Sequence, residues 1–117
     1  MLGYFLSRLR WRVIWSFDGW KHAWRSEHSF RTWVWANVVS DILALALPIG
    51  GTERMVIIVV GLLVLAAELL NTAVEALADL VDGKPNPAIK ACKDMGSAAV
   101  AVTALAGGVA WVWALLA

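Results

Sequence analysis

The stretch MVIIVVGLLVLAAELLNTAVEALADLV, residues 55–81, decides how this chain folds. It begins as an uninterrupted apolar run and then acquires acidic and amide side chains. A helix that crosses a bilayer needs about 20 largely apolar residues, and this stretch is longer than that. It therefore predicts a membrane-spanning helix whose last turns are polar. The polar residues are Glu68, Asn71, Glu75 and Asp79.

The composition of the whole chain also indicates a membrane protein. Hydrophobic residues make up 61% of its 117 residues and charged residues 16%, whereas a soluble domain has about 45–50% and about 25%. A chain of this length is expected to form one domain. The single cysteine, Cys92, excludes an internal disulfide, and no cluster of Cys and His has the spacing of a zinc site.

Residues 1–28 predict an amphipathic surface helix. Apolar residues recur every three or four positions, which places them on one face, while most basic residues lie elsewhere. The apolar face comprises Leu2, Leu6, Leu9, Val13, Phe17, Trp20 and Trp24. A basic helix rich in tryptophan is typical of one that lies in the membrane interface. The alternative is a surface helix packed against a protein partner.

Two further segments predict membrane spans, which makes the expected fold an all-α membrane protein. Residues 31–49 form the weaker candidate, because Asn37, Ser40 and Asp41 interrupt it. Residues 97–117 form the other candidate and are apolar to the C-terminus.

The distribution of Lys and Arg predicts the orientation of these spans. Six of the ten basic residues precede residue 32, and three more lie in the loop at residues 82–95. Basic residues favour the cytoplasmic side, so both segments should be cytoplasmic and the C-terminus periplasmic. Within the loop, Gly83, Pro85 and Pro87 should break the helix.

The polar residues of the 55–81 stretch share one helical face. At 100° per residue, Glu68, Glu75 and Asp79 point within about 20° of one direction, with Asn71 about 60° to the side. A charge in hydrocarbon costs at least about 2.5 kcal/mol, so such a stripe favours a functional site. The alternative is that it joins helices or subunits. Carboxylates on one face repel unless a cation or proton joins them. We therefore expect a hard cation such as Mg²⁺.

Three more charged residues should lie at the same depth. Glu27 precedes the first span, and Lys93 and Asp94 precede the third. Carboxylates for a metal, a lysine for phosphate and a carboxylate base are the parts that phosphoryl transfer needs. As structural alternatives, Asp94 could be the N-cap of the third span, and Lys93 could extend toward the aqueous interface. No Walker motif or kinase glycine loop is present.

The motif AELLNTAVEALADL followed by KDMGSAAV resembles the signature of the bacterial diacylglycerol kinase family, which includes undecaprenol kinases. Arg8, Gly19, the EHSFR segment at residues 27–31 and Trp111 also stand at the family's spacing. The resemblance implies an N-terminal surface helix, three transmembrane helices and a homotrimer in the bacterial inner membrane. It also implies transfer of the γ-phosphate of ATP to a lipid hydroxyl at the cytoplasmic interface.

The resemblance further implies roles for individual residues. Glu68 would be the general base, with Asn71 orienting it or the metal shell, and Asp79 would support the cluster. Glu27 and Glu75 would hold Mg²⁺. Nucleotide contacts would come from Arg8, Trp15, Glu27, Glu75, Lys84, Asn86, Lys93 and Asp94. Lipid contacts would come from Arg8, Ser16, Phe30, Arg31, Glu68, Ser97 and Trp111.

The sequence departs from the family pattern near the expected nucleotide contacts. Trp33 stands where members often carry a glutamate, Trp15 replaces a common tyrosine, and KPN at residues 84–86 replaces a Glu-Tyr-His run. The expected function is phosphorylation of diacylglycerol by ATP, without a nucleic-acid partner. Undecaprenol kinase is the alternative within the family. A small oligomeric transporter with intramembrane carboxylates is the alternative from a different class.

Overall fold

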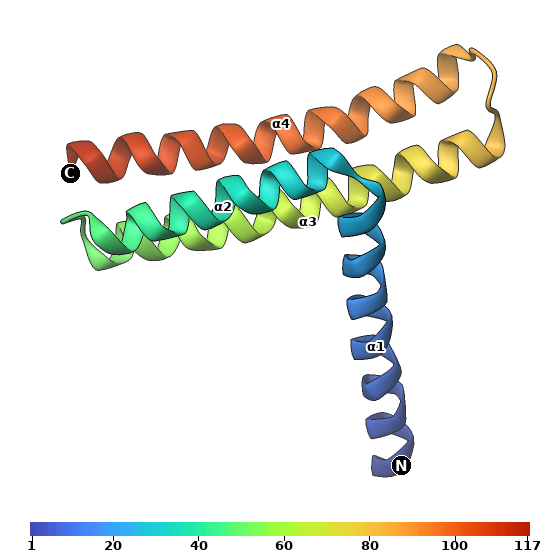
Figure 1. Ribbon diagram of the computed structural model, residues 1–117, viewed down its shortest axis with the longest axis horizontal. Helices are drawn as coiled ribbons and strands as arrows, with labels where there is room; N and C mark the ends of the chain where they lie inside the picture. The colour runs from blue at the N-terminus through green and yellow to red at the C-terminus, as the bar shows by residue number, and fades with distance from the viewer.

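The computed structural model describes residues 1–117 and consists of four helices without a strand. The helices are α1 (Leu2–Ser26), α2 (His28–Ala46), α3 (Gly51–Val81) and α4 (Pro87–Leu116). Helices α2, α3 and α4 run alongside one another, and α1 projects steeply away from them (Figure 1). The all-α prediction is therefore confirmed.

Helix α3 lies at the centre of the packing and contacts both α2 and α4. Glycines allow these close approaches: a Cβ on Gly61 would lie 2.3 Å from Asn37 Oδ1 of α2. Likewise, a Cβ on Gly96 of α4 would lie 2.4 Å from Asn71 Oδ1 of α3. Polar side chains and glycines of neighbouring helices therefore fit together where larger residues would clash.

Small apolar clusters hold the two ends of this packing. Near the α1–α2 junction, Ala23, Phe30 and Leu65 are buried against one another. Toward the other end, Ala44, Ile57 and Ala114 form the corresponding cluster. A hydrogen bond from Trp111 Nε1 to Ser40 Oγ, 2.9 Å long, also links α4 to α2.

Helix α4 begins at Pro87, well before residue 97, where the predicted span starts. Proline suits the first helical position because its missing N–H would have no partner there. The side chain of Asn86 accepts a hydrogen bond from the Ala88 N–H, 2.9 Å long, and caps the helix. The N-cap interpretation of Asp94 is therefore wrong. Asp94 lies within α4 and pairs with Lys90, one turn earlier, at 2.6 Å.

Two arginines satisfy the carbonyl groups left free at helix C-termini. Arg31 Nη1 donates to the Trp24 carbonyl at 2.6 Å, near the end of α1. Arg54 Nε donates to the Ala44 carbonyl at 2.6 Å, near the end of α2. This contact gives Arg54, in the first turn of α3, a structural role.

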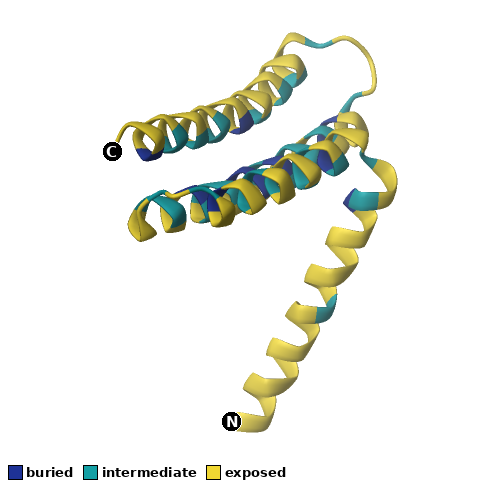
Figure 2. Cartoon of the chain, turned by 60° about the vertical axis from the view of Figure 1, so that its left-hand side comes forward, coloured by how far each residue is buried: buried dark blue, intermediate teal, exposed yellow.

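Most of the apolar surface has no partner within the chain. Only ten of 117 residues are buried, and the accessible surface is 8491 Å², against about 6,200 Å² for a compact soluble monomer of this mass. The outward faces of all four helices are exposed (Figure 2). Such a surface needs lipid or protein to cover it.

Two helices, α3 and α4, are long and apolar enough to cross a membrane. Helix α2 does not meet that criterion, because polar residues interrupt its shorter apolar run. That α2 is a third span, and that α1 lies in the membrane interface, stay predictions.

We expect Gly61→Ala to lower the thermal stability of the detergent-solubilised protein. The added Cβ would displace Asn37, whose Nδ2 donates to the Trp33 carbonyl at 3.0 Å. Overpacking of this kind costs about 1–3 kcal/mol. Gly108→Ala is the matched control, because nothing lies within 4 Å of a Cβ there. Equal melting temperatures for the two variants would contradict the close α2–α3 approach.

Candidate functional site

Glu68 is the only buried charged residue of the chain, with 4% of its surface exposed. It lies on α3 beside the first turn of α2, where Ser29 Oγ donates a hydrogen bond to its Oε1 at 2.7 Å. Sequence reasoning missed Ser29. Its partner is far away in the sequence, so only the serine's place within the EHSFR segment could have drawn attention to it.

Beyond Glu68, α3 continues past the α1–α2 junction for about 20 Å, accompanied by α4 (Figure 1). Asn71 and Glu75 lie on this extension, and Asn71 Nδ2 donates to Glu75 Oε1 at 3.4 Å. Asn71 Oδ1 is buried against Gly96 and has no hydrogen-bond partner. A buried hydrogen-bond acceptor without a partner is uncommon in proteins, so Asn71 Oδ1 is a candidate ligand atom.

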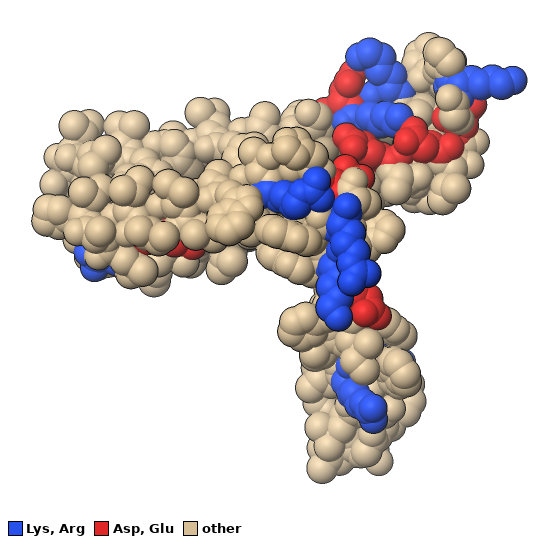
Figure 3. Space-filling model, viewed as in Figure 1, with Lys and Arg blue, Asp and Glu red and all other residues tan.

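The next member of the stripe, Asp79, forms an ion pair with Lys93 of α4, at 2.5 Å. The two side chains are 62% and 38% exposed, so solvent screens the pair and its contribution to stability is small. Charged side chains gather at this end of the molecule and along α1, whereas the opposite half of the helix layer shows few (Figure 3). The stripe therefore runs from an apolar region into a charged one.

The connection between α3 and α4 forms an open pocket next to this ion pair. It is lined by Asp79, Asp82, Gly83, Lys84, Pro85, Asn86, Pro87, Ile89, Lys90 and Lys93. The backbone N–H of Lys84 and the side-chain amide of Asn86 donate to the Asp82 carboxylate at 3.0 and 3.2 Å. The Lys84 bond first, and the Asn86 bond second, lower the pKa of Asp82 below its ordinary value. The Asp82 carboxylate thus holds the conformation of the α3–α4 connection, and three lysines line the pocket beside it.

The pKa of Asp82 predicts how this connection responds to acid. A lowered folded-state pKa gives a stabilisation that is complete above the unfolded value of about 3.9 and is lost as the pH falls through the folded value. The difference in melting temperature between the parent protein and Asp82→Ala should therefore narrow below about pH 4. Asp18→Ala, which removes no hydrogen bond within the chain, is the control. A difference that is constant across this range would contradict the carboxylate's role.

The oxygen atoms of the stripe are of the kind that Mg²⁺ prefers, but one chain brings few of them together. No three His, Cys, Asp or Glu side chains converge on a point that could hold a metal ion. Mg²⁺ commonly takes only one or two protein carboxylates, together with water and substrate phosphates. Glu75 and the unpartnered Asn71 Oδ1 fit that donor set.

The structure brings only some of the expected site residues together. Glu68 lies against the first turn of α2, and Asn71, Glu75, Asp79 and Lys93 follow along the extension where α3 lies beside α4. Glu27 lies between α1 and α2, close in sequence to Ser29. Lys84 and Asn86 line the α3–α4 pocket, and the exposed Ser97 follows Gly96.

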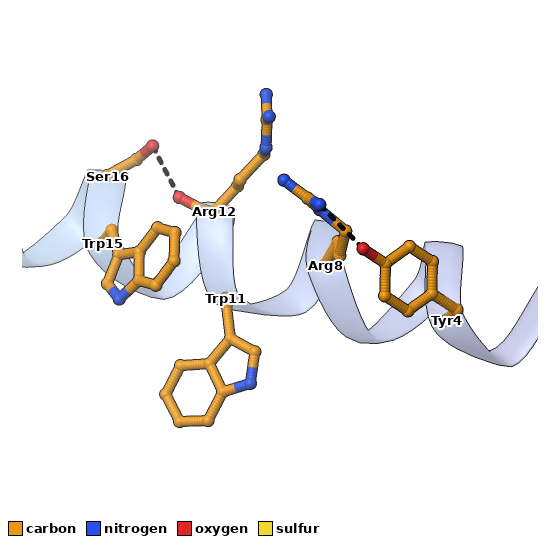
Figure 4. Close-up of a pocket in the computed structure, with 6 residues that line it drawn as sticks. All are labelled: Tyr4, Arg8, Trp11, Arg12, Trp15 and Ser16. Atoms are coloured by element: carbon orange, nitrogen blue, oxygen red, sulfur yellow. Dashed lines mark hydrogen bonds between the residues drawn. The ribbon is translucent and has the colours of Figure 1, made fainter.

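Other expected residues lie away from the stripe within a single chain. Arg8, Trp15 and Ser16 line an open pocket on α1 (Figure 4). From Arg8 to the end of α1 is about 27 Å along the helix, and Arg8 instead donates to the Tyr4 hydroxyl at 2.9 Å. Trp111 contacts Ser40 in the other half of the layer.

Three of the remaining residues are in structural contacts. Phe30 is fully buried, and Arg31 binds the end of α1. Trp33, which replaces an expected glutamate, packs on the cluster of Ala23, Phe30 and Leu65.

Comparisons with known proteins agree with the sequence motif. The model of the prokaryotic diacylglycerol kinase family matches residues 14–115. The chain is 42% identical over 111 residues to a diacylglycerol kinase of Pseudomonas aeruginosa, covering 95% of this chain and 90% of the relative. It is 31% identical over 96 residues to a diacylglycerol kinase of Escherichia coli K12, covering 82% and 79%. A third relative, the diacylglycerol kinase of Haemophilus influenzae, is 32% identical over 98 residues, covering 82% and 81%.

Proposed function

The chain belongs to the prokaryotic diacylglycerol kinase family, and on that premise we propose that it transfers the γ-phosphate of ATP to the hydroxyl of diacylglycerol. The family membership confirms the resemblance drawn from the sequence and identifies the chain as an enzyme. The products of the proposed reaction are phosphatidic acid and ADP. The site of the reaction is the cytoplasmic face of a bacterial inner membrane.

One observation carries the proposal: the polar stripe of α3 begins at a buried carboxylate and ends at a pocket faced by lysines. A lipid kinase must join a substrate held in the bilayer to one that arrives from water. Glu68 lies level with the α1–α2 junction, and Glu75, Asp79 and Lys93 lie progressively farther along the α3–α4 extension. The buried end of the stripe suits a lipid held in the bilayer, and the charged end suits ATP, which arrives from water.

The proposed chemistry assigns one task to each part of the stripe. Glu68 accepts the proton of the lipid hydroxyl as that oxygen forms its bond to the γ-phosphorus and ADP departs. Lys93, near Asp79, contacts the ATP phosphates, and Asp94 and the α3–α4 connection hold the rest of the nucleotide. Glu27 and Glu75 would hold Mg²⁺, whose positive charge would offset the negative charge of the phosphate oxygens. Asn71, which donates to Glu75, orients that carboxylate in the metal shell.

We further propose that the working enzyme is a homotrimer with three spans in each subunit. The exposed apolar faces of α2, α3 and α4 require lipid or other subunits to cover them. In one chain, Arg8, Trp15 and Ser16 lie far from the stripe on α1. Packing of subunits would let α1 of one copy approach the stripe of another, with its tryptophans in the membrane interface.

Phosphorylation of undecaprenol is the alternative within the family. The DMGSAAV motif resembles the diacylglycerol branch more closely. A transporter would be expected to carry its carboxylates near the middle of the membrane. The ion pair of Asp79 with Lys93 and the lysine-faced pocket suit a phosphate site better.

The proposal is tested by comparing Glu68→Gln with the parent protein in lipid–detergent micelles that contain ATP and Mg²⁺. Diacylglycerol and undecaprenol are supplied in parallel, and phosphate transfer to each lipid is measured. We expect transfer to diacylglycerol, lowered at least about 100-fold in Glu68→Gln through loss of the base. Glu53→Gln is the matched control, because Glu53 lies on the first turn of the same helix.

Each outcome of that experiment is informative. Transfer to undecaprenol alone would identify the other branch of the family. No transfer to either lipid by a well-assembled parent protein would remove the kinase proposal. A fully active Glu68→Gln would remove the base assignment.

Glu75→Gln tests the metal role. Loss of one carboxylate ligand should raise the Mg²⁺ concentration needed for half-maximal activity by about 10-fold or more. The measurement is a Mg²⁺ titration of phosphate transfer at saturating ATP, with Glu53→Gln as control. An unchanged titration midpoint would show that Glu75 is not a ligand.

A further inference from the structure

The hydrogen bond from Ser29 is the only one that the side chain of Glu68 makes within the chain. A buried carboxylate requires a donor, because the loss of water is otherwise uncompensated. Ser29 supplies that donor from a different helix, at 2.7 Å. The hydroxyl engages Oε1 and leaves Oε2 free of any partner within the chain.

The backbone that carries Ser29 is firmly held. The next residue, Phe30, is fully buried against Ala23 and Leu65. Its ring also meets that of Trp20 edge-on, with the centroids 4.8 Å apart. Leu65 lies one turn before Glu68 on α3, so the same face of α3 receives both the ring and the hydroxyl. Ser29 is thereby fixed opposite Glu68.

We propose that Ser29 is a positioning residue for phosphate transfer. Its hydroxyl holds Oε1 of Glu68 and so directs Oε2 toward the hydroxyl of the lipid. This inference rests on the proposed function, in which Glu68 is the base. A general base must lie within hydrogen-bond reach of the proton that it removes, and small errors in its orientation reduce the rate.

The fold does not depend on this hydroxyl in the way that it depends on Phe30. Ser29 is an exposed residue in the first turn of α2, so removal of its oxygen leaves no sealed cavity. Alanine is also a better helix former than serine. Ser29→Ala should therefore fold and assemble, which separates a positioning role from a structural one.

The kinetic test compares Ser29→Ala, Ser29→Thr and the parent protein with diacylglycerol and ATP. Ser29→Ala should lower kcat about 10-fold and leave the KM of both substrates within about twofold, because the lost contact orients the base without binding substrate. Ser29→Thr retains a hydroxyl and should restore most of kcat. Ser26→Ala is the matched control, since its hydroxyl donates to the His22 carbonyl of its own helix at 2.7 Å.

A second measurement does not require activity. A hydrophobic carbodiimide labels accessible carboxyl groups in membrane proteins, and mass spectrometry identifies the labelled residue. Glu68 should react faster in Ser29→Ala than in the parent protein or in Ser26→Ala, and Glu68→Gln should remove that signal. An inactive parent protein with this labelling pattern would refute the proposed kinase function while supporting the Ser29 contact.

Two results would overturn the positioning role. One is a kcat for Ser29→Ala within twofold of the parent value, with unchanged labelling of Glu68. The other is a fall in kcat that Ser29→Thr does not restore, or that is accompanied by loss of assembly. In either case the kinase function would still be decided separately, by the Glu68→Gln experiment.

Discussion

The burial of one carboxylate constrains the whole arrangement. Glu68 lies on the apolar face where α3 meets the first turn of α2, and its carboxylate has one hydrogen-bond donor there. The packing of Phe30 against Leu65 sets the level along α3 at which α2 begins, brings Ser29 to Glu68, and so sets the level at which α1 turns away (Figure 1). Because an α-helix has a fixed turn of about 100° per residue, the directions of Asn71, Glu75 and Asp79 are set relative to that of Glu68.

The packing of α3 against its neighbours shows how polar groups are accommodated in an apolar helix layer. Asn37 meets Gly61, and Asn71 meets Gly96, so in both places an amide occupies the space of a missing side chain. Close backbone approach and polar contacts are the means by which helices associate where water does not drive them together. The remaining surface of the layer is apolar and outward-facing, as expected for helices surrounded by lipid or subunits.

Much of this could be predicted from the sequence, because the responsible signals are local. The spacing of Glu68, Asn71, Glu75 and Asp79 predicts a shared face; in the structure Glu68 meets α2, and Asn71 and Asp79 meet α4 farther along α3. The KDMGSAAV motif, together with the stripe, predicts the family. The breaks between α2 and α3 and between α3 and α4 also follow from glycine and proline, whereas the break at Glu27 contains neither.

The features that sequence reasoning missed depend on contacts between distant segments or on competing local signals. Ser29 reveals its role only when α2 lies against Glu68. Aspartate is a common N-cap residue, but Asn86 and Pro87 start α4 earlier in the sequence. Asp94 therefore lies inside the helix. The distance of Arg8 from the stripe depends on the direction of α1, which no periodicity in the sequence encodes.

The extension of α3 and α4 beyond the α1–α2 junction limits which changes of length this chain could accept. One residue inserted into α3 after Glu68 would rotate everything that follows by about 100° and turn Asp79 away from Lys93. Only an insertion of about seven residues, two full turns, made in both helices would restore the pairing. The short connection at residues 83–85 carries no such restriction, because it is not helical and an insertion there does not rotate the side chains of α3 or α4. Variation in length among proteins built on this plan should therefore be found in that connection and avoid the helices.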